Sequence, residues 1–292
     1  MTLVLVHGRD QQEENEALLK KAWCDSLTEG LTAQKLTLPN NLQIEFPFYA
    51  KILAERVQQL DTPLNEEIRT RGGAIDPNYQ QFRGEVVEEI AQRAGVEKAD
   101  VDQAYGDNPK RRGPQNWEWV QAILRAIDRR APGIGSALVE RFTRDVYVYL
   151  EDDITRERIN TLVGKALKSK SAVVVGHSLG SVITYDVLRS AGVALQVPLY
   201  VTLGSPLGLR AIRNRLSPIK FPKPNVAKWL NAYDDRDPIA LHPLDQANFD
   251  VRPDSIDELK DVKNNTPNRH SVVGYLNDRT IAKRIVTALP YP

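Results

Sequence analysis

The 292-residue sequence contains one cysteine, Cys24, and this scarcity excludes two kinds of structure. A single cysteine forms no intrachain disulfide and supplies no cysteine-based metal cluster. The four histidines contain no HxH or HExxH pair, so the familiar zinc patterns are absent too. The acidic run Asp234, Asp235 and Asp237 would bind calcium only with further oxygen ligands. We therefore expect a protein that needs no metal and no other cofactor.

The sequence also has almost no excess charge and no long hydrophobic run. Its 39 basic and 38 acidic side chains leave a net charge of +1, which creates no overall field to attract nucleic acid or an anionic membrane. No apolar stretch approaches the ~20 residues of a membrane-spanning helix. The sequence begins almost directly with the apolar run Leu3–Val6, which leaves no room for a signal segment. We expect a cytoplasmic protein that binds no nucleic acid and has no transmembrane segment.

Alternating apolar runs and amphipathic segments predict an α/β fold with a mostly parallel sheet flanked by helices. The expected helices cover residues 12–30, 154–169, 180–191 and 272–288, and the second begins at Asp152-Asp153. Residues 1–292 are long enough to form one such domain. The expected strands are 2–6, 42–47, 171–176, 198–203 and 227–233, with a weaker one near 247–252.

Residues from about 51 to 145 follow a different pattern, with short amphipathic pieces separated by glycine and proline turns. This pattern predicts a helical cap or lid region inserted into the single domain. The basic run Lys110–Arg112 is more typical of a solvated turn than of an anion site. An apolar stripe in this region is more typical of packing than of a substrate lid; its members are Trp117, Val120, Ile123, Leu124 and Ile127.

The motif with the clearest chemistry is Gly176-His177-Ser178-Leu179-Gly180, which matches the pattern GxSxG. A buried strand, Val173–Val175, precedes the motif, and a helical pattern follows it. A nucleophile elbow needs glycine two residues before and two after its serine, because the strained turn leaves no room for side chains there. The sequence thus predicts that Ser178 is displayed at the carboxyl end of a strand.

Further segments extend the resemblance of this sequence to the α/β-hydrolases, in particular to bacterial lipase-like and serine-esterase-like proteins. The matching segments besides the elbow are Leu3–Gly8, Thr202–Leu207, Trp229–Pro238 and His270. The resemblance implies a nucleophile Ser178, a general base His270 and an orienting acid Asp237, in the chain order that this fold imposes. It also implies an oxyanion hole made of the backbone N–H groups of Leu179 and Arg9.

The acid and the base each have competitors. Asp237 is favoured as the acid because it precedes a short apolar turn, as in the family; Asp234 is second, and Asp250 is an outsider. For the base, His242 follows Asp237 so closely that one loop would have to present both groups, so His270 is favoured.

The two other histidines belong to the motifs themselves. His7 precedes Gly8, and His177 lies between Gly176 and Ser178, beside the backbone expected to form the oxyanion hole. Packing or supporting roles are therefore expected for these two histidines, with Gly8, Gly176 and Gly180 as motif positions.

Together these features predict a serine hydrolase that cleaves a carboxylic ester, with a lipid-like or other acyl group, through an acyl-enzyme intermediate. Its partners would be the small-molecule ester and water. A thioesterase or peptidase is the nearest alternative, because thioesters and amides pass through similar tetrahedral intermediates. An alternative of another class is a non-catalytic scaffold that retains the hydrolase fold. The sequence leaves the acyl chain, the leaving group and the oligomeric state open.

Overall fold

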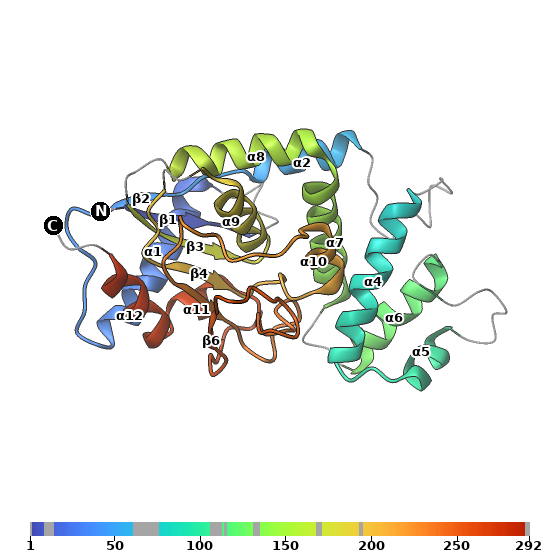
Figure 1. Ribbon diagram of the computed structural model, residues 1–292. Helices are drawn as coiled ribbons and strands as arrows, with labels where there is room; N and C mark the ends of the chain where they lie inside the picture. The colour runs from blue at the N-terminus through green and yellow to red at the C-terminus, as the bar shows by residue number, and fades with distance from the viewer. Residues whose placement is uncertain are drawn as a thin grey trace.

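The computed structural model describes residues 2–8, 15–60, 76–105, 113, 116–130, 135–167, 171–192 and 195–289. At its centre lies an open six-stranded sheet in the order β2-β1-β3-β4-β5-β6, in which every neighbouring pair is parallel (Figure 1). The predicted α/β class is therefore confirmed. The strands are β1 (Thr2–Val6), β2 (Gln43–Glu45), β3 (Ala172–His177), β4 (Tyr200–Leu203), β5 (Trp229–Ala232) and β6 (Asp257–Leu259).

Successive side chains along each strand point to opposite faces of the sheet, so each strand contributes to two hydrophobic cores, one on each face. Leu3 and Leu5 of β1 pack with α1 (Glu16–Thr32), α11 (Val272–Leu276) and α12 (Arg279–Ala288) on one face. Val4 and Val6 face the opposite core, which contains side chains of α2 (Ala50–Gln59), α7 (Ser136–Glu151), α8 (Asp153–Ala166) and α9 (Leu179–Ser190). Both faces are covered, as expected for strands that are apolar on both sides.

Side-chain caps decide where several helices begin. The Asn15 side chain accepts hydrogen bonds from the amides of Ala17 and Leu18 at the start of α1, so this helix begins at residue 16. Residues 12–14 of the expected helix lie outside the described residues. The Asp152 carboxylate accepts from the Thr155 amide and caps α8, where the sequence places a helix start.

Two expectations about the last third of the chain are wrong. The single helix expected at 272–288 is two helices, because Asp278 is extended and its carboxylate caps α12. Residues 247–252 form turns instead of a strand, and the sixth strand is β6 at 257–259. The Asp245 carboxylate accepts from the amides of Ala247 and Asn248, and Asp250 accepts from Arg252, so these side chains bind the backbone that a strand would need for pairing.

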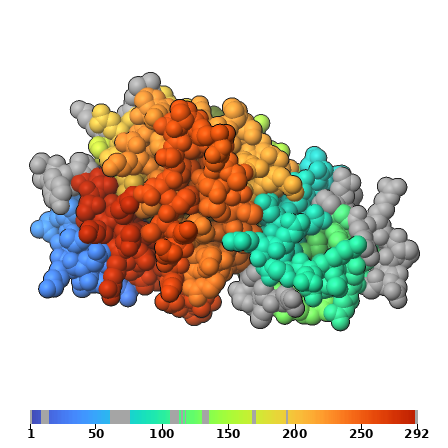
Figure 2. Space-filling model, turned by 60° about the horizontal axis from the view of Figure 1, so that its bottom comes forward, coloured from blue at the N-terminus to red at the C-terminus, as the bar shows by residue number. Residues whose placement is uncertain are grey.

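In the described part of the chain, five helices follow α2 before β3, and α8 is the last of them. Three of them, α4 (Pro77–Arg93), α5 (Lys98–Tyr105) and α6 (Trp117–Arg130), form a lobe at one end of the molecule (Figures 1 and 2). The stripe on α6 is buried, with Val120 and Ile127 fully enclosed, so its expected packing role is confirmed. The Trp117 side chain and the run Lys110–Arg112 lie outside the described residues.

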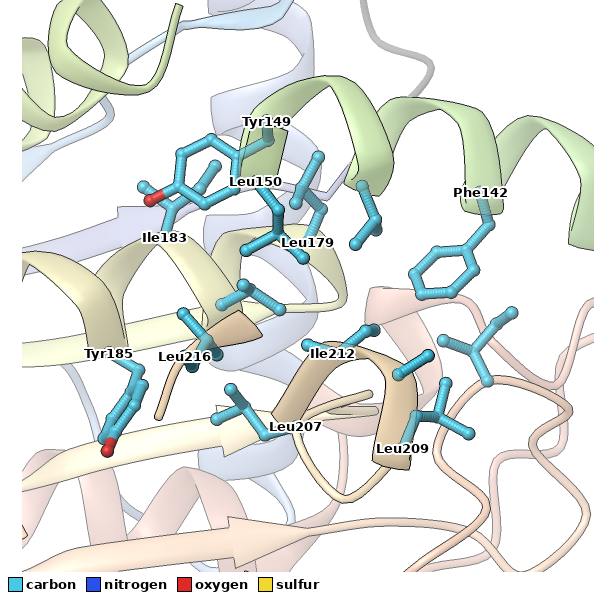
Figure 3. Close-up of a cluster of buried hydrophobic side chains, with 14 of the residues drawn as sticks. Phe142, Tyr149, Leu150, Leu179, Ile183, Tyr185, Leu207, Leu209, Ile212 and Leu216 are labelled. Atoms are coloured by element: carbon cyan, nitrogen blue, oxygen red, sulfur yellow. The ribbon is translucent and has the colours of Figure 1, made fainter. Parts of the chain in front are cut away.

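The fourth helix, α7, connects this lobe to the sheet. Phe142 near its middle and Tyr149 near its end contribute to a buried cluster with α9 and with the α10 segment (Arg210–Arg215), as Figure 3 shows. The Tyr149 hydroxyl also donates a hydrogen bond to Asp186 of α9 at 3.1 Å. The boundaries that the sequence places near 51 and 145 both fall inside helices, α2 and α7, that pack on the body of the fold.

A carboxylate at the last strand is held by neutral donors. Glu258 on β6 accepts from the Asn231 side chain at 3.0 Å and from the Leu244 amide at 2.9 Å. Burial raises the pKa of Glu258 to about 7 despite these bonds, and the charges of Asp245 and Asp257 raise it further.

Glu258 should therefore make the protein less stable as the pH rises. In the unfolded chain this carboxyl ionises near pH 4.5, whereas in the folded protein it stays protonated to about pH 7. Its stabilising contribution is complete below pH 4.5 and is lost between pH 4.5 and 7, by about 3 kcal/mol. Urea unfolding of wild type and Glu258→Gln at several pH values measures this; parallel pH profiles of the two proteins would contradict it.

Candidate active site

The candidate residues gather where the order of the strands reverses. The chain leaves β1 toward β2 on one side and returns to β3 on the other, so the carboxyl ends of β1 and β3 border a crevice. His7 and Gly8 follow β1, and Ser178 follows β3 directly. In open parallel sheets this crevice is the usual place for a ligand.

Ser178 has the strained backbone of a sharp turn between strand and helix. Its φ of 54° and ψ of −128° lie outside the conformations that non-glycine residues usually adopt. At both flanking glycines the surrounding atoms leave no room for a side chain. A Cβ on Gly180 would lie 2.3 Å from the carbonyl oxygens of Val6 and His7, and one on Gly176 would lie 2.6 Å from Thr184 Oγ1. The turn is thus pressed against the end of β1.

The three side chains expected to act together lie in one hydrogen-bonded chain. Ser178 Oγ is 2.7 Å from His270 Nε2, and His270 Nδ1 lies 2.8 Å and 2.9 Å from the two carboxylate oxygens of Asp237. A carboxylate only accepts, so His270 carries its proton on Nδ1 and leaves Nε2 to accept from the serine hydroxyl. This tautomer is the one that a general base needs.

Several groups hold Asp237 in an ionised state. Its side chain is fully buried, and burial alone would raise its pKa. The hydrogen bond from His270 and the positive charge that this residue carries when protonated, together with donors from the Tyr275 hydroxyl at 2.6 Å and the Ile239 amide at 2.8 Å, outweigh burial and lower the pKa of Asp237. The carboxylate therefore keeps its charge at neutral pH.

The other aspartates have different partners. Asp234 accepts from Arg236 at 2.6 Å and from the Asn264 amide at 2.7 Å, and so fixes the turn that precedes Asp237. Burial would raise the pKa of Asp234, but these bonds lower it. Asp250 binds Arg252 on an exposed loop. Of these three carboxylates, only Asp237 is hydrogen-bonded to His270.

His242, the alternative base, contacts a different carboxylate. Its Nε2 atom lies 2.9 Å from Glu89 Oε1 on α4, and both residues line a second pocket together with Arg210 and Arg213 of α10. Ser178 does not line that pocket.

The two motif histidines support the site as neutral groups. Burial lowers the pKa of His7 to about 4, and its ring stacks on Tyr49 with a centroid distance of 4.2 Å. Burial, followed by the positive charge of His270, lowers the pKa of His177 to about 3. His177 Nε2 donates to the His270 carbonyl at 2.9 Å and holds the loop that carries His270.

The expected oxyanion donors are only partly within the described chain. Leu179 is the first residue of α9, so its amide has no carbonyl partner four residues earlier inside the helix. Gly8 lies close to the serine: a Cβ there would be 3.1 Å from Ser178 Cβ. Arg9 lies outside the described residues.

A pocket of about 410 Å³ opens at Ser178. His7, His177 and His270 line it near the serine. Its walls come from α1, from the first turns of α7 and from the loop that leads into α11; they are made of Leu19, Ala22, Trp23, Leu138, Arg141, Asn268, Ser271, Val272 and Val273. The volume lies toward the lower end of the range of small-molecule sites.

Within the described parts of the chain, His, Cys, Asp and Glu side chains form no group of three able to hold a metal ion. Among the described helices, none combines the length and hydrophobicity that crossing a bilayer requires. Comparison of the sequence and structure with family models, curated proteins and solved structures gives no match.

Tyr275 had no role in the expectations from sequence. Tyr275 donates to Asp237 and accepts from the Asp234 amide at 3.1 Å, so one phenol joins both aspartates. Burial, and then the charge of Asp237, raises the pKa of Tyr275 and keeps it a donor. In the sequence, the only sign of this role was that Tyr275 lies five residues after His270, within an apolar run. Gly204 follows β4 with a φ of 53°, directly against Asp237.

Gly204→Ala should destabilise the protein through both strain and collision. A Cβ at this position would lie 2.9 Å from Asp237 Oδ2, 3.1 Å from Tyr275 and 3.3 Å from His270 Nδ1. Gly95→Ala is the matched control, because Gly95 has a φ of 71° but no atom within 4 Å of an added Cβ. We expect Gly95→Ala to lose about 1 kcal/mol of unfolding free energy, and Gly204→Ala at least 1 kcal/mol more. Equal losses in urea unfolding would show that the site tolerates the methyl group.

Proposed function

We propose that this protein is a serine hydrolase of the α/β-hydrolase type that cleaves a carboxylic ester through an acyl-enzyme intermediate. The observation that carries the proposal is the hydrogen-bonded chain from Ser178 through His270 to a buried, ionised Asp237. A structural serine needs neither a strained backbone nor a neutral imidazole nitrogen on its hydroxyl. Both features support activation of a nucleophile.

The first half of the reaction transfers the acyl group to the protein. Ser178 Oγ attacks the ester carbonyl carbon while its proton passes to His270 Nε2. The resulting imidazolium faces Asp237, whose negative charge stabilises it. His270 then gives the proton to the departing alkoxide, the carbon–oxygen bond breaks, and an alcohol leaves. Ser178 remains as an acyl ester.

The second half uses water in the place of the serine. His270 takes a proton from water, and the resulting hydroxide attacks the acyl carbonyl carbon. The bond to Ser178 Oγ breaks, and His270 returns the proton to this oxygen, which releases a carboxylic acid. In both halves the developing oxyanion needs donors, and the Leu179 amide at the start of α9 is suited to be one of them.

The position of the site supports the same proposal. The serine lies at the reversal point of a parallel sheet and borders a pocket whose lining includes three histidines and the apolar side chains of Leu19, Leu138 and Val273. Apolar walls suit an acyl group, because burial of its methylene groups favours binding. Esters, thioesters and amides share the acyl-transfer step, and the ester is proposed as the substrate on the basis of the resemblance noted above.

Labelling with a fluorophosphonate tests the nucleophile. The probe should modify wild type and leave Ser178→Ala unmodified, because only an activated serine displaces fluoride from phosphorus. Ser271→Ala is the matched control: Ser271 lines the same pocket, and its side chain forms no capping hydrogen bond at the start of α11. Intact-mass measurement would show one adduct on wild type and on the control. An adduct on folded Ser178→Ala would assign the nucleophile elsewhere.

Substitution of the two aspartates tests the acid. Asp237→Asn should lower kcat for p-nitrophenyl acetate by about a thousandfold or more, because the amide no longer favours the Nδ1–H tautomer or the imidazolium of His270. Asp234→Asn should lower kcat less than about tenfold and act mainly on thermal stability, since its partners are Arg236 and Asn264. Equal losses of kcat in two folded variants would remove the assigned role of Asp237.

A further inference from the structure

Tyr275 is a buried phenol at the centre of the site that takes no part in the reaction steps described above. Its hydroxyl donates to Asp237 Oδ2 at 2.6 Å, and the same carboxylate oxygen lies 2.8 Å from His270 Nδ1. Tyr275 and His270 therefore bind one oxygen atom of Asp237. A hydrogen bond that stabilises the negative charge on this oxygen also weakens its attraction for a proton on His270.

The surroundings of Tyr275 keep its phenol a strong donor. The side chain is fully buried, and burial, followed by the charge of Asp237, raises the pKa of Tyr275, so the hydroxyl keeps its proton. The Asp234 amide donates to the phenol oxygen at 3.1 Å. A hydroxyl that accepts a hydrogen bond becomes a stronger donor, so this contact strengthens the bond from Tyr275 to Asp237.

The protonation state of His270 decides when Ser178 can be activated. An imidazolium has no free electron pair to accept the serine proton, so activation requires neutral His270. The negative charge of Asp237 favours the imidazolium. The phenol opposes this effect, because the positive end of its O–H dipole lies against the carboxylate oxygen nearest to His270. The hydrogen bond thus extends the neutral form of His270 to lower pH.

Other charged groups surround His270, and the hydrogen bond of Tyr275 acts in addition to them. His177, whose ring centroid lies 4.8 Å from that of His270, is neutral because burial lowers its pKa to about 3. The titratable and charged side chains of the described chain around His270 and its pocket come from the ends of β1, β3 and β5, from α7, from the loop before α11 and from α11; they are His7, His177, Asp234, Arg236, Asp237, Arg141, Arg269 and Tyr275. Only Tyr275 changes when its phenol oxygen is removed, so a comparison of wild type with that variant isolates its effect.

We propose that Tyr275 is a positioning residue that sets the pH range in which Ser178 is active: its hydrogen bond to Asp237 keeps His270 neutral at a lower pH than Asp237 alone would allow. The inference rests on the proposed function, because it takes Ser178 as the nucleophile and His270 as its base. Asp237 orients His270, and Tyr275 limits how strongly that carboxylate favours the protonated imidazole.

The pH dependence of fluorophosphonate labelling tests the inference. In wild type the labelling rate should rise with pH as His270 loses its proton. Tyr275→Phe removes only the hydroxyl, so the midpoint of this rise should move up by about half a pH unit or more. The variant should be labelled about threefold more slowly below both midpoints and at a similar rate above them. A lower rate at every pH with an unchanged midpoint would show a merely structural role and overturn the inference.

A second buried tyrosine provides the matched control. The Tyr149 hydroxyl donates to Asp186 at 3.1 Å, its side chain is fully buried, and it is not among the described residues that line the pocket at Ser178. Tyr149→Phe should lower thermal stability and keep the midpoint of wild type. If Tyr275→Phe does not fold, a fluorotyrosine in place of Tyr275 supplies the test. Its more acidic phenol is a stronger donor, so the midpoint should move down; a midpoint equal to that of wild type would contradict the inference.

NMR of the imidazole nitrogens gives a readout that does not depend on labelling. The signals of the four histidines are followed with pH, and that of His270 is identified by its loss in His270→Gln. The protonation midpoint of His270 should be higher in Tyr275→Phe than in wild type and unchanged in Tyr149→Phe. Equal midpoints in wild type and folded Tyr275→Phe would refute the effect of Tyr275 on His270.

The outcomes separate the two proposals. Labelling of wild type together with an unshifted midpoint in folded Tyr275→Phe would overturn the role of Tyr275 and leave the serine hydrolase standing. Absence of labelling in folded wild type would overturn the serine hydrolase and, with it, the role of Tyr275 in activating Ser178, whatever the NMR midpoints are.

Discussion

The close approach of the Ser178 turn to the end of β1 is the constraint on which the rest of the site depends. Gly180 lies so near the Val6 and His7 carbonyls that any side chain there would collide with the backbone. This contact holds a serine at a positive φ of 54°, a conformation that needs support from its surroundings. The same contact brings the β1 end, with His7 and Gly8, beside the serine, so the pocket and the turn are built by one packing arrangement.

The charge in this site is stabilised by a second arrangement, centred on Tyr275. Its hydroxyl donates to Asp237 and accepts from the Asp234 amide, and Gly204 leaves room for both side chains. A fully buried carboxylate is unfavourable unless donors surround it. Here His270, Tyr275 and the Ile239 amide supply them, which explains how burial and a lowered pKa occur together at Asp237. Under the proposed function, this preserves the tautomer that His270 needs.

The helix α7 contributes both to the hydrophobic core and to the pocket at Ser178. Its buried side attaches the α4–α6 lobe to the sheet through Phe142 and Tyr149, and its first turns supply Leu138 and Arg141 to the pocket (Figure 3). One side of this helix is therefore buried in the core, and its first turns border the pocket. Because α7 belongs to the segment between β2 and β3, its pocket residues can vary without disturbing β1 and β3, the strands beside Ser178.

Local patterns in the sequence were sufficient for the α/β class, five of the six strands, the Asp152 cap and the turn at Ser178. Each depends on residues adjacent in the chain: β-branched runs, a capping carboxylate or paired glycines. The sequence favoured Asp237 over Asp234, and the contact between Asp237 and His270 agrees with that preference. Tertiary structure alone decided that Tyr275 joins the two aspartates, that β6 replaces the expected strand at 247–252, and that Arg141 lines the pocket. These contacts join residues distant in sequence, so they depend on how the packed elements approach one another, which no local pattern records.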